Sequence, residues 1–238
     1  MMKAWLLAGA LATVAVAGET NTADTILTAV ANRRPTKDLD LRARLFLTRE
    51  KFVPLQIQVK NLPAETRTLY RAEGVELLVT QPVEGEPRFY QRGKGELTGD
   101  ARLQKLAGSE FTFYDLGLPF LHWPERQLTG VETFRGRDCH VIEVAATNQP
   151  YARVKLWVDK EYQAFLRAEA RNADGDVVRR ILMTSFKRVE NLWIPRAIDC
   201  SFVPPNQALP AAEKSRLEML TGNYDAQLPA AEFDPAKF

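Results

Sequence analysis

The sequence is poor in the side chains from which most metal and redox sites are built. It contains two histidines and two cysteines among 238 residues, whereas a zinc site takes three or four ligands from His, Cys, Asp and Glu. Neither histidine lies in an HExxH spacing, and Cys139 and Cys200 are too far apart for a CxxC redox pair. The sequence therefore predicts no metal and no cofactor.

Motifs for nucleophilic or nucleotide chemistry are also missing. There is no GxSxG nucleophile elbow and no GxxxxGKS/T phosphate loop. His140 shares a predicted strand face with Ile142 and Val144, which indicates a partly buried structural histidine. These absences predict a protein that is not an enzyme. An enzyme whose site forms around Asp115 and His122 is the alternative that the residues leave open.

Charge of one sign is not concentrated anywhere in the chain. Lys and Arg number 32, Asp and Glu number 30, and the two signs are interspersed. A nucleic-acid-binding protein usually carries a clustered excess of basic residues. The balance therefore predicts no nucleic-acid partner.

The N-terminal residues have the pattern of a secretory signal peptide. Lys3 supplies a positive charge, and the apolar run Ala4–Val16 is shorter than the roughly 20 residues that cross a bilayer. Ala15 and Ala17 are small residues at the two positions that a signal peptidase reads. We expect residues 1–17 to be cleaved; a membrane-spanning helix is the alternative.

The remainder, residues 18–238, has the length of one β-rich domain. Gly18 stands where a bacterial lipoprotein would carry its acylated cysteine, which predicts an exported protein without a lipid anchor. In an oxidising compartment an even number of cysteines permits a disulfide, here between Cys139 and Cys200. Two buried free thiols that pack as small apolar residues are the other interpretation.

Hydrophobic periodicity predicts one short helix followed by many strands. Ile26, Leu27 and Val30 recur at helical spacing before Pro35 ends the helix. From Leu39 onward apolar and polar residues alternate, which is typical of strands with one buried and one solvated face. About eleven or twelve strands are predicted, over Leu39–Leu47, Val53–Lys60, Thr66–Arg71, Val75–Thr80, Pro87–Arg92, Leu128–Phe134, Cys139–Ala145, Ala152–Val158, Phe165–Arg171, Val177–Arg188, Trp193–Val203 and Lys214–Tyr224.

The pattern is interrupted at residues 99–126, where a short helix is predicted over Asp100–Ala107. The segment Gly108–Pro124, GSEFTFYDLGLPFLHWP, is irregular and yet rich in large apolar side chains. Irregular chain normally lies at the surface, so this segment is predicted either to plug the core or to form a flap over an apolar ligand site. Asp115 would need a hydrogen-bond partner there, and we expect it to be a structural anchor. The candidate ligand-binding residues are Phe111, Phe113, Tyr114, Leu116, Phe120, Leu121 and Trp123.

Four segments resemble the LolA-like superfamily of outer-membrane lipoprotein-sorting proteins, which includes LolB and the lipoprotein-sensing domain of RseB. They are GSEFTFYDL (108–116), GRDCHVIEV (136–144), VKLWVDKEY (154–162) and RAEARNADGDVVRR (167–180). The resemblance implies a mainly β fold, an incomplete and strongly curved antiparallel β-barrel of about eleven strands with a few short helices plugging the open side. It also implies a cavity for acyl chains between the concave face and these helices.

The function that the resemblance implies is the binding of a lipid or lipoprotein in the periplasm. A carrier or chaperone in outer-membrane lipoprotein or lipid trafficking would hold an acyl chain and meet an envelope transporter or an outer-membrane acceptor. An envelope sensor or accessory subunit that binds a transporter or signalling partner through the same fold is the alternative. Neither interpretation requires a membrane-spanning segment.

Overall fold

A computed structural model describes residues 22–189, 192–204 and 213–238, so the predicted signal peptide lies outside the described residues. The described chain begins with helix α1 (Ala23–Ala31). The hydroxyl of Thr22 caps this helix by accepting a hydrogen bond from the backbone N–H of Thr25 at 3.2 Å. Ile26 and Leu27 are buried, so the predicted helix and its apolar face are confirmed.

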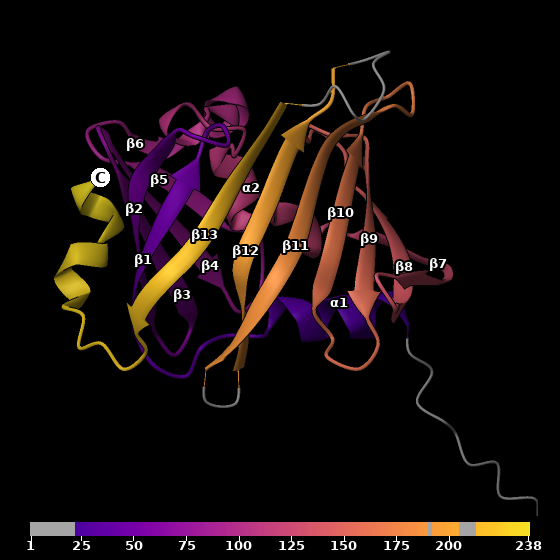
Figure 1. Ribbon diagram of the computed structural model, residues 1–238, viewed down its shortest axis with the longest axis horizontal. Coiled ribbons are helices and arrows are strands. Elements are labelled where there is room, and N and C mark those ends of the chain that lie inside the picture. The colour runs from indigo at the N-terminus through magenta and orange to yellow at the C-terminus, as the bar shows by residue number, and fades with distance from the viewer. Residues whose placement is uncertain (1–21, 190–191, 205–212) are drawn as a thin grey trace, which may run out of the picture.

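Thirteen strands of the described chain form one antiparallel sheet that does not close into a barrel, in the spatial order β6-β5-β4-β3-β2-β1-β13-β12-β11-β10-β9-β8-β7. The chain builds one meander from β1 to β6, crosses to the opposite edge, and returns from β7 to β13 beside β1. Figure 1 shows the twisted sheet in front of helices α1 and α2. The strands are β1 (Leu39–Phe46), β2 (Phe52–Asn61), β3 (Glu65–Ala72), β4 (Val75–Pro82), β5 (Arg88–Gln91), β6 (Gly95–Leu97), β7 (Glu125–Phe134), β8 (Arg137–Ala145), β9 (Arg153–Asp159), β10 (Phe165–Arg171), β11 (Val177–Val189), β12 (Leu192–Phe202) and β13 (Glu213–Asn223).

The predicted fold class is confirmed, and every predicted strand is present. The sequence prediction misses β6, which is three residues long and follows directly on the turn at Gly93. So short a strand shows no alternation that could separate it from a turn.

The two faces of the sheet follow the alternation of the sequence. In β1, Leu39, Leu41 and Leu45 are buried in the main core, while Arg42 and Arg44 between them are exposed. A sheet cannot bury its apolar face alone. Here α1 and the chain between β6 and β7 cover that face, which we call the concave face.

The chain that crosses from β6 to β7, here called the plug (residues 98–124), consists of short helical pieces. They are the 3₁₀ turns η1 (Gly99–Leu103) and η2 (Leu106–Gly108), helix α2 (Phe113–Gly117) and the 3₁₀ turn η3 (Pro119–His122). The helix predicted over Asp100–Ala107 is wrong. Two 3₁₀ turns replace it, because Ala107 adopts the left-handed region with a φ of 46° and interrupts any continuous helix.

The opposite, convex face is covered in part by the C-terminal residues. The 3₁₀ turns η5 (Ala230–Phe233) and η6 (Pro235–Lys237) place Phe233 and Phe238 in a second apolar cluster with Leu69 of β3. Of the helices within the described ranges, none has the length and apolar character needed to span a membrane.

Cys139 and Cys200 are both free and buried, so the predicted disulfide is not formed. Cys139 lies on β8 in an outer cluster with Val141 and Trp157, whereas Cys200 lies on β12 in the main core. Strands β9, β10 and β11 separate β8 from β12. Burial raises the pKa of the Cys139 thiol to about 11. The two cysteines therefore pack as small apolar residues, which is the second of the two interpretations.

Candidate functional site

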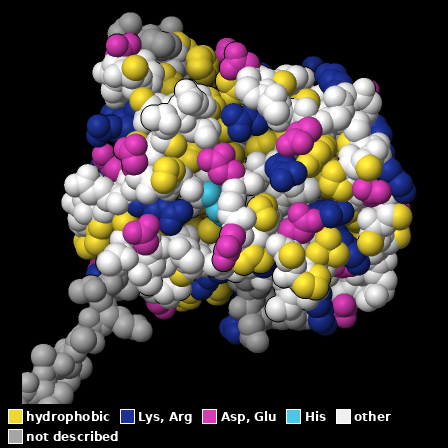
Figure 2. Space-filling model, turned by 180° about the vertical axis from the view of Figure 1, so that it is seen from behind, with side chains coloured by type: hydrophobic (Ala, Val, Ile, Leu, Met, Phe, Trp, Pro, Cys, Tyr) yellow, Lys and Arg dark blue, Asp and Glu magenta, His cyan; other side chains and the backbone are white. Residues whose placement is uncertain are grey.

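The candidate ligand-binding residues of the plug lie inside the molecule. Leu116 is half-buried against the main core. Figure 2 views the molecule from behind, on the side of the helices, and its surface mixes hydrophobic, basic and acidic side chains rather than one continuous apolar face. The structure therefore shows a plug that completes the core, and its opening as a flap stays a prediction. The buried members are Phe111, Phe113, Tyr114, Phe120, Leu121 and Trp123.

A reciprocal capping box fixes the central helix of the plug. The hydroxyl of Thr112 accepts a hydrogen bond from the backbone N–H of Asp115 at 3.2 Å, and the Asp115 carboxylate accepts one from the Thr112 N–H at 2.7 Å. Two backbone donors at the start of α2 are thereby satisfied. Asp115 is nevertheless a carboxylate that is only 4 % exposed. A buried charge of this kind needs an oppositely charged partner.

Arg179 of β11 is that partner. Its Nε and Nη2 atoms lie 2.8 and 2.6 Å from Oδ2 of Asp115, and Nη2 also donates to the carbonyl oxygen of Glu110. Burial alone would lower the pKa of Arg179, but the charge and hydrogen bonds of Asp115 raise it above its ordinary value, so the guanidinium stays protonated. The expectation that Asp115 anchors the plug is confirmed.

Sequence reasoning missed Arg179, although a signal was present. Arg179 has the same phase in β11 as Ile181 and Met183, which are buried in the main core. A cation in phase with the apolar side of a strand has to meet an acid or remain an uncompensated buried charge. Asp115, the acid among the apolar residues of the plug, could therefore have been predicted as the partner of Arg179.

The plug fits closely against β5. A Cβ atom on Gly117 would lie 2.4 Å from Cζ of Phe89, so a larger residue cannot approach the ring as Gly117 does. The next residue, Leu118, has φ 49° and ψ 48°, a left-handed conformation that costs an L-residue roughly 1–2 kcal/mol. The chain therefore passes from α2 to η3 through Gly117, which has no room for a side chain, and Leu118, whose backbone is strained.

A cavity of about 280 Å³ lies where the plug, α1 and the sheet meet. This mouth cavity is lined by Leu121 and Leu118 of the plug, by residues at the end of α1 and by residues of strands β11 and β12. Of the candidate ligand-binding residues, Leu121 lines the cavity, and the others are packed in the core or against it. Apolar wall residues from the sheet include Phe165, Met183, Phe186 and Ile194.

The ionisable side chains that line the mouth cavity are basic. They are Arg33, Arg34 and His122, and no Asp or Glu occurs among its described lining residues. The Arg34 guanidinium donates a hydrogen bond to the carbonyl oxygen of Pro82. Burial lowers the pKa of His122, and the charges of Arg126 and Arg34 lower it further, so this imidazole is neutral at pH 7.

The residues of the enzyme alternative do not meet in one cleft. Asp115 bonds to Thr112 and Arg179, whereas His122 lines the mouth cavity, whose lining does not include Asp115. His140 is buried on β8, as expected for a structural histidine, and burial lowers its pKa. Within the part of the chain that the structure describes, no three His, Cys, Asp or Glu side chains are grouped to hold a metal ion.

Comparison with known proteins bears on the fold. A family model described as an uncharacterised protein matches residues 95–238. No curated protein matches the sequence. Among solved structures, a DUF1329 family protein from Desulfovibrio piger is similar with a TM-score of 0.71 and 17 % sequence identity, over 87 % of this chain and 94 % of that chain.

Two further structures extend the similarity. An outer membrane lipoprotein-sorting protein domain from Vibrio parahaemolyticus has a TM-score of 0.73 and 13 % identity, over 88 % of this chain and 95 % of that chain. A LolA superfamily protein from Nitrosomonas europaea has a TM-score of 0.61 and 18 % identity, over 90 % of this chain and 97 % of that chain. At these identities the similarity establishes a shared fold.

Proposed function

Because this chain belongs to the family of uncharacterised proteins whose model matches residues 95–238, and because its fold is LolA-like, we propose that it is a periplasmic carrier or chaperone that binds the acyl chain of a lipoprotein or another lipid. The observation that carries this proposal is the mouth cavity, which opens between the plug and an apolar sheet. The similar structures named for lipoprotein sorting and for the LolA superfamily support the class of ligand.

The way in which the plug is held supports an exchange of plug for lipid. Inside the core, Asp115 and Arg179 form the ion pair that joins the plug to the sheet, while the aromatic side chains around it contribute apolar contacts. Breaking a buried pair costs about 3–5 kcal/mol. Each buried methylene of an acyl chain contributes about 0.8 kcal/mol. A chain of roughly six methylenes offsets a loss of this size, and a longer chain also replaces the apolar contacts of the plug.

Filling the mouth cavity tests the proposal. Ala164 is half-buried and lines the cavity, so Ala164→Trp would occupy the space with an indole ring. We expect the protein, purified from a periplasm without detergent, to lose most of its bound lipid when this substitution is made. Native mass spectrometry followed by solvent extraction measures the bound mass and its identity.

The matched control is Ala173→Trp, at an exposed turn outside the lining of the cavity. It should retain lipid as the wild type does, and thermal unfolding checks that both variants are folded. Full lipid retention by folded Ala164→Trp would contradict the proposal, and so would a wild-type protein that carries no lipid and takes up none on incubation.

An envelope accessory role is the second candidate, and edge strand β7 favours it. Leu128 and Val131 on this strand are 38 and 55 % exposed, and β7 pairs with β8 on one side of the sheet. A free strand edge is a template for pairing with another chain. An unliganded wild type that crosslinks to an envelope protein through β7 would favour this role over that of a carrier.

A further inference from the structure

From the charge and size of the mouth cavity, we infer that the ligand is an amphiphile with one acyl chain and a carboxylate head group, such as a long-chain fatty acid, and that Arg34 binds the carboxylate. The inference rests on the proposed function and deepens it. It assigns the head group, the number of chains and one residue that distinguishes charged from neutral ligands.

The size of the cavity limits the number of chains. Pockets for small ligands usually enclose about 300–1,000 Å³, and the mouth cavity, at about 280 Å³, lies just below this range. With the plug in place this volume leaves room for no more than one chain, and several chains would require the plug to leave. Its walls include Met183, whose flexible side chain adapts to irregular apolar ligands.

The charge of the cavity selects the head group. Arg33 and Arg34 line it without a carboxylate among the described lining residues. Glu65, whose negative charge raises the pKa of Arg34, accepts a hydrogen bond from Nε of Arg67 at 2.7 Å and so already has a cationic partner. The cavity wall therefore carries positive charge that no carboxylate among the described lining residues neutralises.

Arg34 is the better placed of the two arginines. Its Nη2 donates to the carbonyl oxygen of Pro82, which holds the side chain at the rim, whereas its buried Nη1 has no hydrogen-bond partner among the described residues. A buried charged donor without an acceptor is costly. Nη1 has almost no accessible surface, so a carboxylate reaches it when the guanidinium turns toward the cavity. The carboxylate then accepts a charge-assisted hydrogen bond, the strong kind that guanidinium groups form. Arg33 is exposed.

The test compares palmitate with hexadecanol, which has the same chain length and no charge, each kept below the concentration at which it aggregates or separates from solution. Calorimetric titration of the delipidated wild type should show palmitate bound at least about tenfold more tightly, as expected for a hydrogen bond to a charged group. Arg34→Gln should remove this preference and leave hexadecanol binding unchanged. Arg33→Gln, the matched control at the neighbouring exposed arginine, should keep it.

Each outcome has a distinct meaning. Equal affinity of the wild type for both ligands overturns the inference and leaves the proposed function standing. Binding of neither ligand also overturns the inference, whereas the proposed function is decided separately by the lipid that the wild type retains from the periplasm. A preference that survives in Arg34→Gln but is lost in Arg33→Gln overturns the assignment to Arg34. If Arg34→Gln does not fold, Arg34→Lys tests the same point, because a preference fully kept by an ammonium group contradicts a role for the buried Nη1 atom.

Discussion

The two faces of the sheet both contain ion pairs, but they are built in different ways. On the concave face, Asp115 and Arg179 pair inside an apolar core, where both side chains are almost inaccessible to water. On the convex face, Asp199 lies between Lys214 and Arg216, each 2.6 Å away, and both basic side chains are about half-exposed. Glu169 is likewise shared by two arginines.

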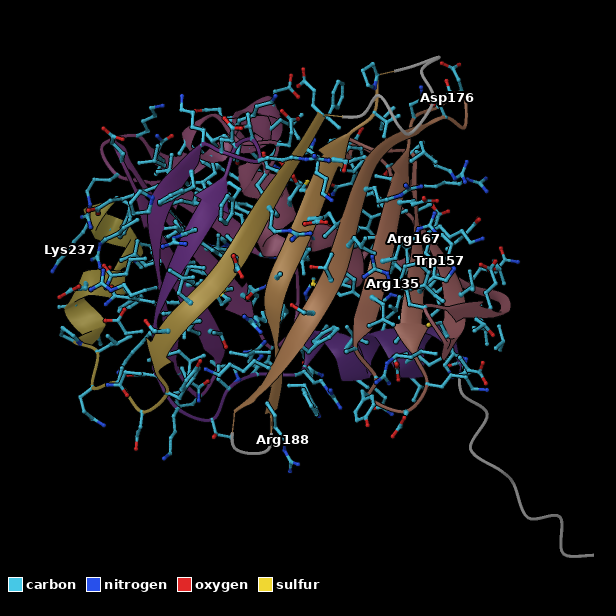
Figure 3. All side chains as sticks on the ribbon, viewed as in Figure 1. Arg135, Trp157, Arg167, Asp176, Arg188 and Lys237 are labelled. Atoms are coloured by element: carbon cyan, nitrogen blue, oxygen red, sulfur yellow. The ribbon has the colours of Figure 1, made fainter. Side chains whose placement is uncertain are left out.

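The convex pairs continue into a cluster of aromatic and charged residues. Nε1 of Trp157 donates to Glu132 at 2.7 Å, and the Arg167 guanidinium lies 4.2 Å from the centre of a Trp157 ring. Figure 3 shows Trp157 and Arg167 close together on strands β9 and β10. Asp199 and Glu169 each therefore keep a basic partner when one base is removed. Within the described core, Asp115 has Arg179 as its basic partner and no second base beside it. Loss of Arg179 therefore leaves the buried carboxylate without a counter-charge.

Removal of Arg179 should have the largest effect. Arg179→Met leaves the Asp115 carboxylate buried without its cation, and we expect the free energy of unfolding to fall by about 3–5 kcal/mol. Urea denaturation measures this change. Arg216→Met on the convex face is the control and should cost about 1 kcal/mol or less, because Lys214 remains and the lost partner is partly exposed. Similar losses for the two variants would show that the faces do not differ.

Crowding the plug without changing its charge should have an intermediate effect. Gly117→Ala places a methyl group against the ring of Phe89, and overpacking of this kind costs about 1–3 kcal/mol. In a Phe89→Leu background the same substitution should cost less, because the smaller side chain leaves room. A double-mutant cycle measures this coupling. Additive losses would mean that Phe89 is not the residue that excludes a larger side chain at position 117.

The smallest effect concerns acid stability and belongs to the convex face. Burial alone would raise the pKa of Asp199, but hydrogen bonds from Arg216 and Lys214 lower it below its usual range. The stabilisation is therefore present above the unfolded-state pKa of about 3.9 and is lost as pH falls through the lower folded-state value. Asp199→Asn should be less stable than the wild type at pH 6, with the difference shrinking below about pH 4. A difference that does not change with pH would contradict this account.

The sheet could be predicted from the sequence because its signal is local. Alternation in Leu39–Leu45 fixes which face is buried regardless of what lies opposite. The core packing of the plug was one of two expected outcomes, since its aromatic content required burial. Its conformation was not predictable, because it depends on left-handed backbone at Ala107 and Leu118 and on the fit of Gly117 to Phe89.

The mouth cavity could not be found from the sequence at all. Its walls come from the end of α1, the plug and strands β11 and β12, which are distant in the chain and carry no shared motif. In the sequence, Arg34 is one of two adjacent arginines at the end of a predicted helix, just before Pro35, and nothing there distinguishes it from Arg33. Its buried Nη1 atom becomes visible when tertiary contacts are known.

The position of β1 beside β13 has a kinetic consequence. Leu41 pairs with Gly222 across this join, so the contact spans most of the chain and cannot form until the last strand is available. Contacts of such sequence separation slow folding, because a long loop must close before any stabilisation is gained. During synthesis the first meander, β1 to β6, would wait with one edge of β1 unpaired. Chaperone protection of that edge would then matter most in the interval before β13 arrives.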